Sequence, residues 1–310
     1  MSLNSGSSPN VIKTALDLVF DSEYGLESQP GYATVDTPSV FMQDSTDRAA
    51  VIVEQFMGPG YFETRAEQQD VPQGVAKVGN QKTFSVLNYS KSVDIPKNFF
   101  DDDQHSTVDK LIRRMARNAR LTKSKNAFNQ FNLGFTTVLT NDGVALFSNS
   151  HVTLDGTTVD NLETGVLSEA TLDVAFQSLL TQKTQDGTLG GHVPAVLLVP
   201  PTLFKNANIF AKSTLRPTTT NNDMNYVSEL YPGLQVLQSP FLGAAYGGSA
   251  TAWFLLSADH SMIRWVRQAI ETSMVPWQNQ RNNNYIYKAE YREVVGPISF
   301  EGIVGSSGTV

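Results

Sequence analysis

The stretch HSTVDKLIRRMARNARLTKSKN, residues 105–126, decides the fold because it predicts one long helix with two unlike faces. Apolar residues recur along it at the spacing of a single helical face, at positions 108, 111, 112, 115 and 119. Ser106 or Thr107 is placed to cap its start, and its length is roughly 33 Å at 1.5 Å per residue. We expect the helix to end or to change partners near Lys125, because Phe128 and Phe131 fall off the apolar stripe.

The opposite face of this helix is basic. Seven Lys or Arg residues stand against one Asp between positions 105 and 132, in a chain whose net charge is −7. Such a face either is a solvated surface or contacts an anion such as nucleic acid. No aromatic residues are interleaved, so only non-specific phosphate contact is expected. The candidate DNA-facing residues are Lys110, Arg113, Arg114, Arg117, Arg120 and Lys123.

The chain before the helix predicts an arm and a long hairpin. Residues 1–57 read as an extended arm with one short amphipathic helix over 11–20. Residues 58–97 read as a two-stranded excursion with a polar tip, which has little to bury by itself and needs another surface. We expect its apolar side to contact neighbouring copies through Phe84, Val86, Val93 and Ile95.

The chain after the helix predicts an α+β unit. Ser168 is placed to cap a helix, and a second helix is expected over 203–212. Residues 193–199 form a nearly continuous apolar strand that should be covered on both sides. Further strands are expected at 234–237, 253–257, 285–295 and 298–304.

The composition of the chain limits the classes of protein to which it can belong. Hydrophobic residues make up 40% of the 310 residues, which is enough for a core, and charged residues only 17%. The chain has no cysteine, so it has no disulfide or thiolate metal site. No apolar run approaches the length of a membrane span, so no membrane association is expected.

Catalytic constellations are missing from the sequence. The four histidines, at positions 105, 151, 192 and 260, do not show metal-ligand spacing, and no nucleophile elbow or phosphate loop is present. His151 is open to acid–base work with Asp155, but a hydrogen-bonded structural histidine is favoured. Asp101–Asp103 is open to cation binding, but a solvated acidic turn is favoured. We therefore expect no enzyme, with no catalytic, cofactor or metal residues.

Three segments resemble a known family. DGVALFSNSH at 142–151, PAVLLVPPTL at 194–203 and YREVVGP at 291–297 are similar to segments of the Mu-type major head subunits of tailed bacteriophages. Together they cover the C-terminal two thirds of the chain, and the first third matches by layout. The resemblance implies the Hong Kong 97-type capsid fold.

That fold implies a division of the chain. The N-terminal arm is expected at 1–57 and the extended loop at 58–97. The peripheral domain is expected at 98–165 and 271–310, with its spine helix at 105–126, and the axial domain at 166–270.

The resemblance also implies a function. The expected protein is a major capsid subunit that self-assembles into pentamers and hexamers of an icosahedral shell around phage double-stranded DNA. Expected partners are copies of itself, packaged DNA, a separate scaffold protein, a portal and decoration proteins, with assembly in the cytoplasm of the bacterial host and residence in the virion. The alternatives are an encapsulin-type nanocompartment, a soluble hydrolase built around His151 or His192, and a tail component.

Overall fold

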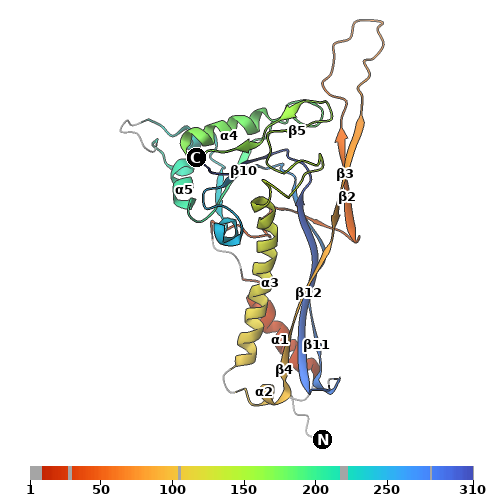
Figure 1. Cartoon of the computed structure of the whole chain (residues 1–310), viewed down its shortest axis with the longest axis vertical. Coiled ribbons are helices and arrows are strands. Elements are labelled where there is room, and N and C mark those ends of the chain that lie inside the picture. Colours follow the sequence, from red (N-terminus) through yellow and green to blue (C-terminus); the bar gives the residue numbers. More distant parts are fainter. Residues whose placement is uncertain (1–8, 27–29, 104–105, 217–222, 280, 310) are drawn as a thin grey trace.

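The helix predicted from residues 105–126 forms the axis of the molecule. The computed structural model describes residues 9–26, 30–103, 106–216, 223–279 and 281–309, and in it this helix, α3, spans Thr107–Asn132. It runs along the long dimension of the molecule, from the lower end to the upper group of strands (Figure 1). Asp103 caps its start, since the carboxylate accepts from the amides of Thr107 (3.0 Å) and Val108 (2.8 Å). The predicted cap by Ser106 or Thr107 is wrong, because Ser106 makes no capping hydrogen bond.

α3 packs into two different cores along its length. Val108 and Ile112 are buried in a lower core, whereas Phe128 and Phe131 are fully buried in an upper one. The predicted change of partners near Lys125 is confirmed. The helix does not end there because the upper core buries its last two turns.

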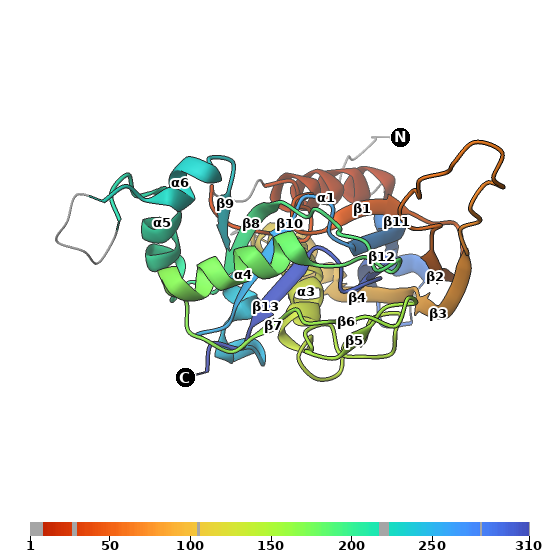
Figure 2. The same cartoon turned by 90° about the horizontal axis from the view of Figure 1, so that it is seen from above.

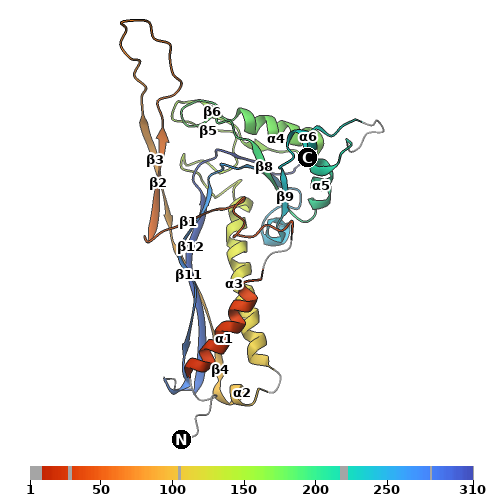
Figure 3. The ribbon, with the colours of Figure 1, turned by 180° about the vertical axis from the view of Figure 1, so that it is seen from behind.

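The lower core lies against a long four-stranded sheet. Its strand order is β1-β11-β12-β4, with bounds β1 Met42–Ser45, β11 Met262–Val275, β12 Asn284–Pro297 and β4 Leu87–Pro96. β11, β12 and β4 pair antiparallel, and β1 pairs parallel to β11. α3 and the N-terminal helix α1, Pro9–Tyr24, cover one face of this sheet, and Figure 3 shows α1 lying across α3. The other face carries exposed polar residues such as Lys288 and Glu290.

The predicted N-terminal arm packs within its own subunit. The expected helix at 11–20 is present and longer, and its apolar residues Ile12, Leu16 and Phe20 are buried in the lower core. Val35 and Phe41 are fully buried in the upper core. These arm residues are therefore covered within their own subunit.

A buried arginine ties the segment after α1 to the long sheet. Arg264 on β11 donates to Glu293 on β12 at 2.7 and 2.9 Å. It also donates to Asp36 at 2.5 Å and to Gln43 at 3.0 Å. Arg264 and Glu293 are both buried, whereas the Asp36 side chain is 62% exposed.

The upper core lies against one face of a five-stranded sheet. Its order is β7-β13-β10-β8-β9, with bounds β7 Leu162–Glu163, β13 Ile303–Ser306, β10 Trp253–Ser257, β8 Pro194–Val199 and β9 Gln235–Gln238. Alternate residues of β8 and β10 enter the upper core and a third core on the opposite face. That third core lies under α4 Glu169–Thr181, α5 Phe204–Lys212 and α6 Tyr226–Leu230. The prediction that β8 is covered on both sides is confirmed, and so is the cap of α4 by Ser168.

The strand pairing corrects the predicted hairpin. β2, Ala50–Met57, pairs with β3, Lys77–Ser85, so the hairpin begins in the segment assigned to the arm. β4 was expected as the second strand of the hairpin, but it belongs to the long sheet through β12. The hairpin projects beyond the rest of the molecule at the upper right of Figure 1.

The strand pairing also corrects the division between the two larger parts. β11 of the long sheet begins at Met262, inside the range expected for the axial domain. β13, expected in the peripheral domain, pairs with β10 in the five-stranded sheet. The remaining elements are short: α2 Lys97–Asp101, β5 His151–Val152, β6 Thr158–Val159, and the 3-10 turns Pro240–Leu242, Ala244–Tyr246 and Trp277–Asn279. Within the described ranges, no helix is both long and apolar enough to cross a membrane.

Candidate assembly surfaces

The basic face of α3 divides into exposed and engaged residues. Lys110, Arg113, Arg114 and Arg117 are exposed, and their side chains form no hydrogen bond or ion pair with any residue that the structure describes. We call these four residues the basic face. The lower core takes the other side of the helix, and of the basic face Arg114 lies nearest to the long sheet, beside β4.

Lys123 does not belong to the basic face. Its side chain is 4% exposed and donates to the hydroxyl of Tyr24 at 2.6 Å. Its ammonium also lies 4.4 Å from the ring centroid of Tyr291. Burial lowers the pKa of Lys123, although Glu293 opposes the shift. The prediction that Lys123 faces DNA is therefore wrong, because α1 and β12 enclose it.

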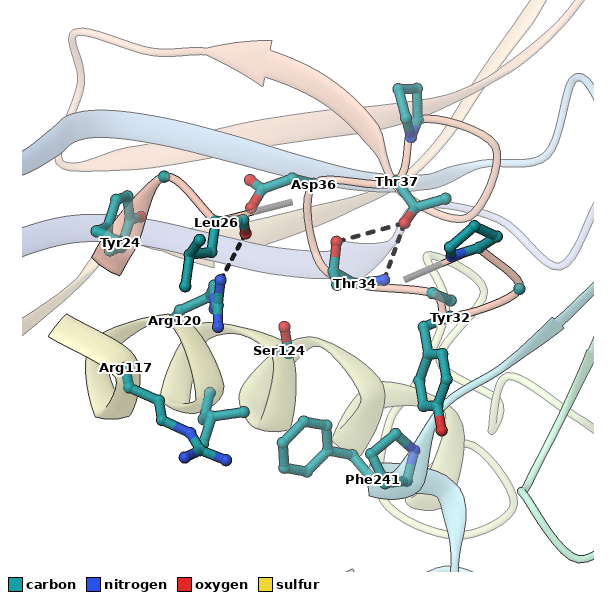
Figure 4. Close-up of a pocket in the computed structure, with 17 residues that line it drawn as sticks. Tyr24, Leu26, Tyr32, Thr34, Asp36, Thr37, Arg117, Arg120, Ser124 and Phe241 are labelled. Carbon is teal, nitrogen blue, oxygen red and sulfur yellow. Dashed lines mark hydrogen bonds between the residues drawn. The ribbon is translucent and has the colours of Figure 1, made fainter. Parts of the chain in front are cut away.

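Arg120 is only partly available. It donates to the carbonyl of Leu26 at 2.5 Å, at the edge of a hollow of about 1130 Å³ between α3 and the segment after α1 (Figure 4). Asp36 also lines this hollow. Arg120 is thus one of the contacts that hold the segment after α1 against the helix.

A second hollow, of about 670 Å³, lies between α3 and the edge strand β4. Apolar groups line most of it, among them Leu111 and Met115 from α3 and Val93 from β4. Arg114 and Lys91 stand on its two sides, and no acidic residue lines it. We call this hollow the β4 groove.

The base of the hairpin is fixed to its own subunit. Lys82 donates to the carbonyls of Leu139 and Pro297, the latter at 3.0 Å. Phe84 is 6% exposed and its ring centroid lies 4.8 Å from that of Trp265. Burial lowers the pKa of Lys82 to about 8, with Asp142 opposing the shift.

Two of the four apolar residues predicted to contact neighbouring copies are therefore buried within their own subunit. Phe84 packs on Trp265, and Ile95 is 1% exposed in the lower core. Val93 packs partly against the same core, and Val86 is half-buried at the end of the hairpin. The prediction is wrong for Phe84 and Ile95, because the long sheet and its helices cover them.

A second set of contacts holds the hairpin to the loop after α4. Gln55 donates to Gln185 at 2.5 Å, and the amide of Gly58 donates to Asp186 at 2.9 Å. The hydroxyl of Tyr61 accepts from the amide of Leu189 at 3.0 Å. The sequence did not suggest these residues, since their pairing joins positions more than 120 residues apart.

Beyond this base the hairpin has no cover. We call residues 59–76 the hairpin tip; every residue from Pro59 to Val78 is exposed, and the tip's contact with the body is the hydrogen bond of the Tyr61 hydroxyl. Within the tip, Tyr61 is 69% exposed, Phe62 fully exposed and Val71 68% exposed. Adjacent apolar groups on an otherwise uncovered loop indicate a surface that another molecule covers.

The histidines have structural surroundings. His151 contacts Asp142 at 2.6 Å and the carbonyl of Leu146 at 3.2 Å, and it stacks on Phe300. It pairs with Asp142 and not with Asp155, and it is a hydrogen-bonded structural histidine, as favoured from the sequence. His192 contacts Asp259 at 2.8 Å, and His260 lies near the carbonyl of Ser39 at 3.2 Å. His105 lies outside the described residues. No group of three His, Asp or Glu residues within the described part of the chain is arranged to hold a metal ion.

The family comparison and the structure comparison both point to phage capsid proteins. A family model described as phage capsid protein matches residues 80–306. The search of curated proteins found no match.

Solved structures that are similar to this chain include phage capsids and the capsid of a GTA particle. The capsid of Myoviridae phage XM1 matches with a TM-score of 0.52 at 13% identity, over 91% of this chain and 94% of that chain. The mature capsid of bacteriophage PhiM1 matches with a TM-score of 0.57 at 12% identity, over 91% and 89%. The capsid of an empty GTA particle matches with a TM-score of 0.53 at 9% identity, over 94% and 98%. At these identities the likeness concerns the fold, which is the Hong Kong 97-type fold expected from the sequence.

Proposed function

This chain belongs to the phage capsid protein family and is a major capsid protein, and from that premise we propose how it builds a shell. The subunits form rings of five and six copies, and the rings close an icosahedral shell around phage double-stranded DNA. The observation that carries this proposal is the hairpin tip, since an exposed loop with Tyr61, Phe62 and Val71 on its surface needs a neighbour to cover it.

The placement of the hairpin suits a ring. Figures 1 and 2 both show the hairpin on one side of the long sheet and α3 on the other. A contact between two different surfaces of identical subunits generates a ring when the rotation closes. Such a contact forms if the hairpin, on one side of a subunit, binds the opposite side of the next copy.

Several weak contacts per subunit are enough for a stable shell. Each subunit in a closed shell is held by all its neighbours at once, so the effective concentration at every interface is high. The base of the hairpin is fixed by Gln55, Gly58 and Lys82, so little conformational freedom is lost there on assembly.

The role that we propose is structural and involves no catalysis. Within the phage capsid proteins, we propose that the chain is one of the Mu-type major head subunits. The protein resides in the virion, and we propose that it assembles in the cytoplasm of the bacterial host. A scaffold protein, a portal and decoration proteins are proposed partners, because a shell that takes in DNA needs control of its size and an entry point.

Electron microscopy of the purified protein at high concentration, with light scattering on the same sample, tests the proposal. We expect large closed particles whose contents absorb as nucleic acid when they are isolated from phage. Closed particles filled with protein and free of nucleic acid would support the encapsulin-type alternative, and tubes would support a tail component. A compact monomer that loses an activity when His151 or His192 is replaced would support the hydrolase.

A shortened hairpin tests the part played by the tip. Replacing residues 61–75 with a short Gly-Ser loop retains the β2–β3 pairing, so the subunit should fold with an unchanged melting temperature and fail to form shells. The control is a loop of unchanged length in which only Gln68 and Gln69 become Ser, which should assemble. Normal shells from the shortened variant would contradict the role assigned to the tip.

A further inference from the structure

The loop that holds the base of the hairpin is itself held by one carboxylate. In the loop after α4, Gln185 accepts a hydrogen bond from Gln55 of β2 at 2.5 Å, and both side chains are buried. The next residue, Asp186, accepts from the amide of Gly58 at 2.9 Å. The backbone amide of Gln185 donates in turn to the carboxylate of Glu301 at 3.1 Å. Glu301 therefore positions both residues that hold β2, and we call Glu301, Gln185 and Asp186 the clamp.

Glu301 stands on a fixed support. It lies in the turn between β12 and β13, and Gln182 at the end of α4 binds the backbone on both sides of it. The Gln182 side chain donates to the carbonyl of Phe300 at 3.3 Å and accepts from the amide of Gly302 at 2.7 Å. Gln182 is 3% exposed, so these bonds are shielded from water. A movement at the clamp therefore displaces the loop after α4 and the hairpin, while Glu301 stays in place.

Ionisable side chains face the clamp from the elements packed around it. They are Asp186 and His192 from the loop after α4, Asp259 from the turn after β10, Asp155 from the turn between β5 and β6, and Tyr61 from the hairpin. Asp186 repels a negative charge on Glu301, and His192 attracts one. His192 also contacts Asp259 at 2.8 Å, so its attraction is divided between two carboxylates. A charge on Glu301 is thus poorly compensated in the clamp.

The protonation of Glu301 is coupled to the closure of the clamp. Burial raises the pKa of Glu301 above the ordinary 4.5, and Asp186 adds to the shift, whereas His192 and the hydrogen bonds from Gln185 oppose it. A protonated carboxyl retains an oxygen that accepts from the Gln185 amide, so the bond survives without the charge. A carboxyl with a raised pKa binds its proton more tightly in the closed clamp than in water. The closed clamp is therefore stabilised as pH falls through the raised value and is weakened as pH rises.

We propose that Glu301, Gln185 and Asp186 form a proton-sensitive clamp on the hairpin, closed when Glu301 is protonated and loosened when Glu301 is charged. In the loosened state the loop after α4 moves off Glu301, and Gln55 and Gly58 lose their partners while both sheets stay intact. β3 remains attached through Lys82, so the opening frees only one strand of the hairpin. The inference concerns the single subunit and goes beyond the proposed function.

Hydrogen exchange of the unassembled subunit tests the clamp. The amides of Gly58 and Gln185 exchange only when their bonds to Asp186 and Glu301 open. Rates divided by those of an unstructured peptide at the same pH remove the intrinsic pH dependence of exchange. The resulting protection of these two amides should fall about threefold or more from pH 5 to pH 8. Protection of the central strand β10 should not change over this range, and it serves as the internal reference.

Replacement of Glu301 separates its charge from its hydrogen bond. Glu301→Gln retains an acceptor that cannot ionise, so protection should stay high from pH 5 to pH 8. Glu301→Ala removes the acceptor, so protection should be low throughout. The matched control is Glu163→Gln on β7, which removes another carboxyl whose pKa burial raises and should leave the fall unchanged. Melting temperatures show which variants fold, and if Glu301→Ala does not fold, Glu301→Gln carries the test.

Replacement of His192 gives a second readout, which a merely structural role for Glu301 would not move. His192→Gln removes the group that attracts the charge of Glu301, so the loss of protection should shift to higher pH. A shift to lower pH would contradict the inference.

A consequence for assembly rests on the proposed function. A closed clamp leaves less conformational freedom to lose when the hairpin binds a neighbour. Glu301→Gln should therefore form shells at pH 8 in higher yield than the unmodified protein.

The outcomes separate the two ideas. Constant protection from pH 5 to pH 8 in the unmodified subunit, or an equal fall in Glu301→Gln, would overturn the inference and leave the shell role intact. Protection that falls as expected in a protein that forms no shells under any condition would support the clamp and count against the proposed function.

Discussion

At the scale of single residues, the pair His151 and Asp142 holds the loop that follows α3. The two ring nitrogens of His151 face a carboxylate and the carbonyl of Leu146, and both of these groups only accept hydrogen bonds. The contact between His151 and Asp142 closes residues 142–151, the segment with the first family resemblance.

Asp142→Asn should be strongly destabilising. It removes the carboxylate charge that accepts hydrogen bonds from His151, Thr140 and the Val144 amide, and losing hydrogen bonds to a charged group costs about 1.5–3 kcal/mol. Urea denaturation of the unassembled subunit measures the loss. Asp155→Asn, on an exposed turn nearby, is the control and should change the free energy of unfolding by less than about 0.5 kcal/mol. Equal losses in the two variants would contradict the special role of Asp142.

The same carboxylate gives a pH dependence with a defined sign. Burial raises the pKa of Asp142, but hydrogen bonds from His151, Thr140 and the Val144 amide outweigh it and leave the pKa below the ordinary 3.8. A carboxyl whose folded pKa is lowered stabilises the fold above its unfolded pKa, and this contribution is lost as pH falls through the folded value. Melting curves from pH 7 to pH 3 should therefore fall less steeply for Asp142→Asn than for the unmodified protein.

At the scale of elements, α3 shows what periodicity can and cannot predict. The apolar stripe from Val108 to Met115 located the helix, because one core covers that part. Phe128 and Phe131 broke the stripe only because a second core approaches from another side. The basic face was visible as charge, but the burial of Lys123 was not, since Tyr24 and Tyr291 enclose it from distant positions.

The hairpin shows a second limit of prediction from the sequence, which concerns strand pairing. Alternation of apolar residues shows that a strand has one buried face but does not identify its neighbour. β4 alternates as a hairpin strand would, yet it pairs with β12, some 195 residues further along the chain. β2 was missed as the true partner of β3 because its apolar run was continuous with the arm. The tip's aromatic residues, Tyr61 and Phe62, could be seen in the sequence, but the extent of their exposure could not.

The anchor of the hairpin should depend on Lys82. Lys82→Met retains the aliphatic stem and removes the ammonium that joins β3 to the carbonyls of Leu139 and Pro297. Two carbonyls then lose a charged donor, and we expect a loss of about 1–3 kcal/mol in the free energy of unfolding. Lys77→Met, on the exposed part of β3, is the matched control and should have almost no effect. Guanidinium denaturation of both variants measures the difference.

The joint between the segment after α1 and the long sheet should depend on Arg264. Arg264→Met leaves Glu293 as an unpaired buried charge, at a cost of about 3–5 kcal/mol. Asp36→Asn removes only the exposed partner and should cost less than about 1 kcal/mol. Chemical denaturation measures both. If Arg264→Met combined with Glu293→Leu is as unstable as Arg264→Met alone, the loss does not come from the unpaired carboxylate.

At the scale of the whole molecule, the subunit combines a well-packed body with one uncovered projection. Three cores include most large apolar side chains of the body, whereas the tip has none of this cover. The tip should therefore be the part of the unassembled subunit that is most accessible to proteases.

Limited trypsin digestion should cut unassembled subunits first at Arg65, within the tip. Assembled shells should resist the cut by about tenfold or more, since the neighbour covers the loop. Arg48, which is also exposed but lies close to the body, provides an internal control. Equal cleavage at Arg65 in free and assembled protein would show that the tip stays uncovered in the shell.

The passage of α3 through two cores has a consequence for the curvature of a shell. α3 is a single unbroken helix of 26 residues that packs into both cores and so joins the long sheet to the five-stranded sheet. In the shell that we propose, rings of five would be more sharply domed than rings of six, so identical copies would meet at more than one dihedral angle. In such a shell, a slender loop that contacts the next copy through apolar side chains can accommodate a range of angles where two rigid bodies would collide.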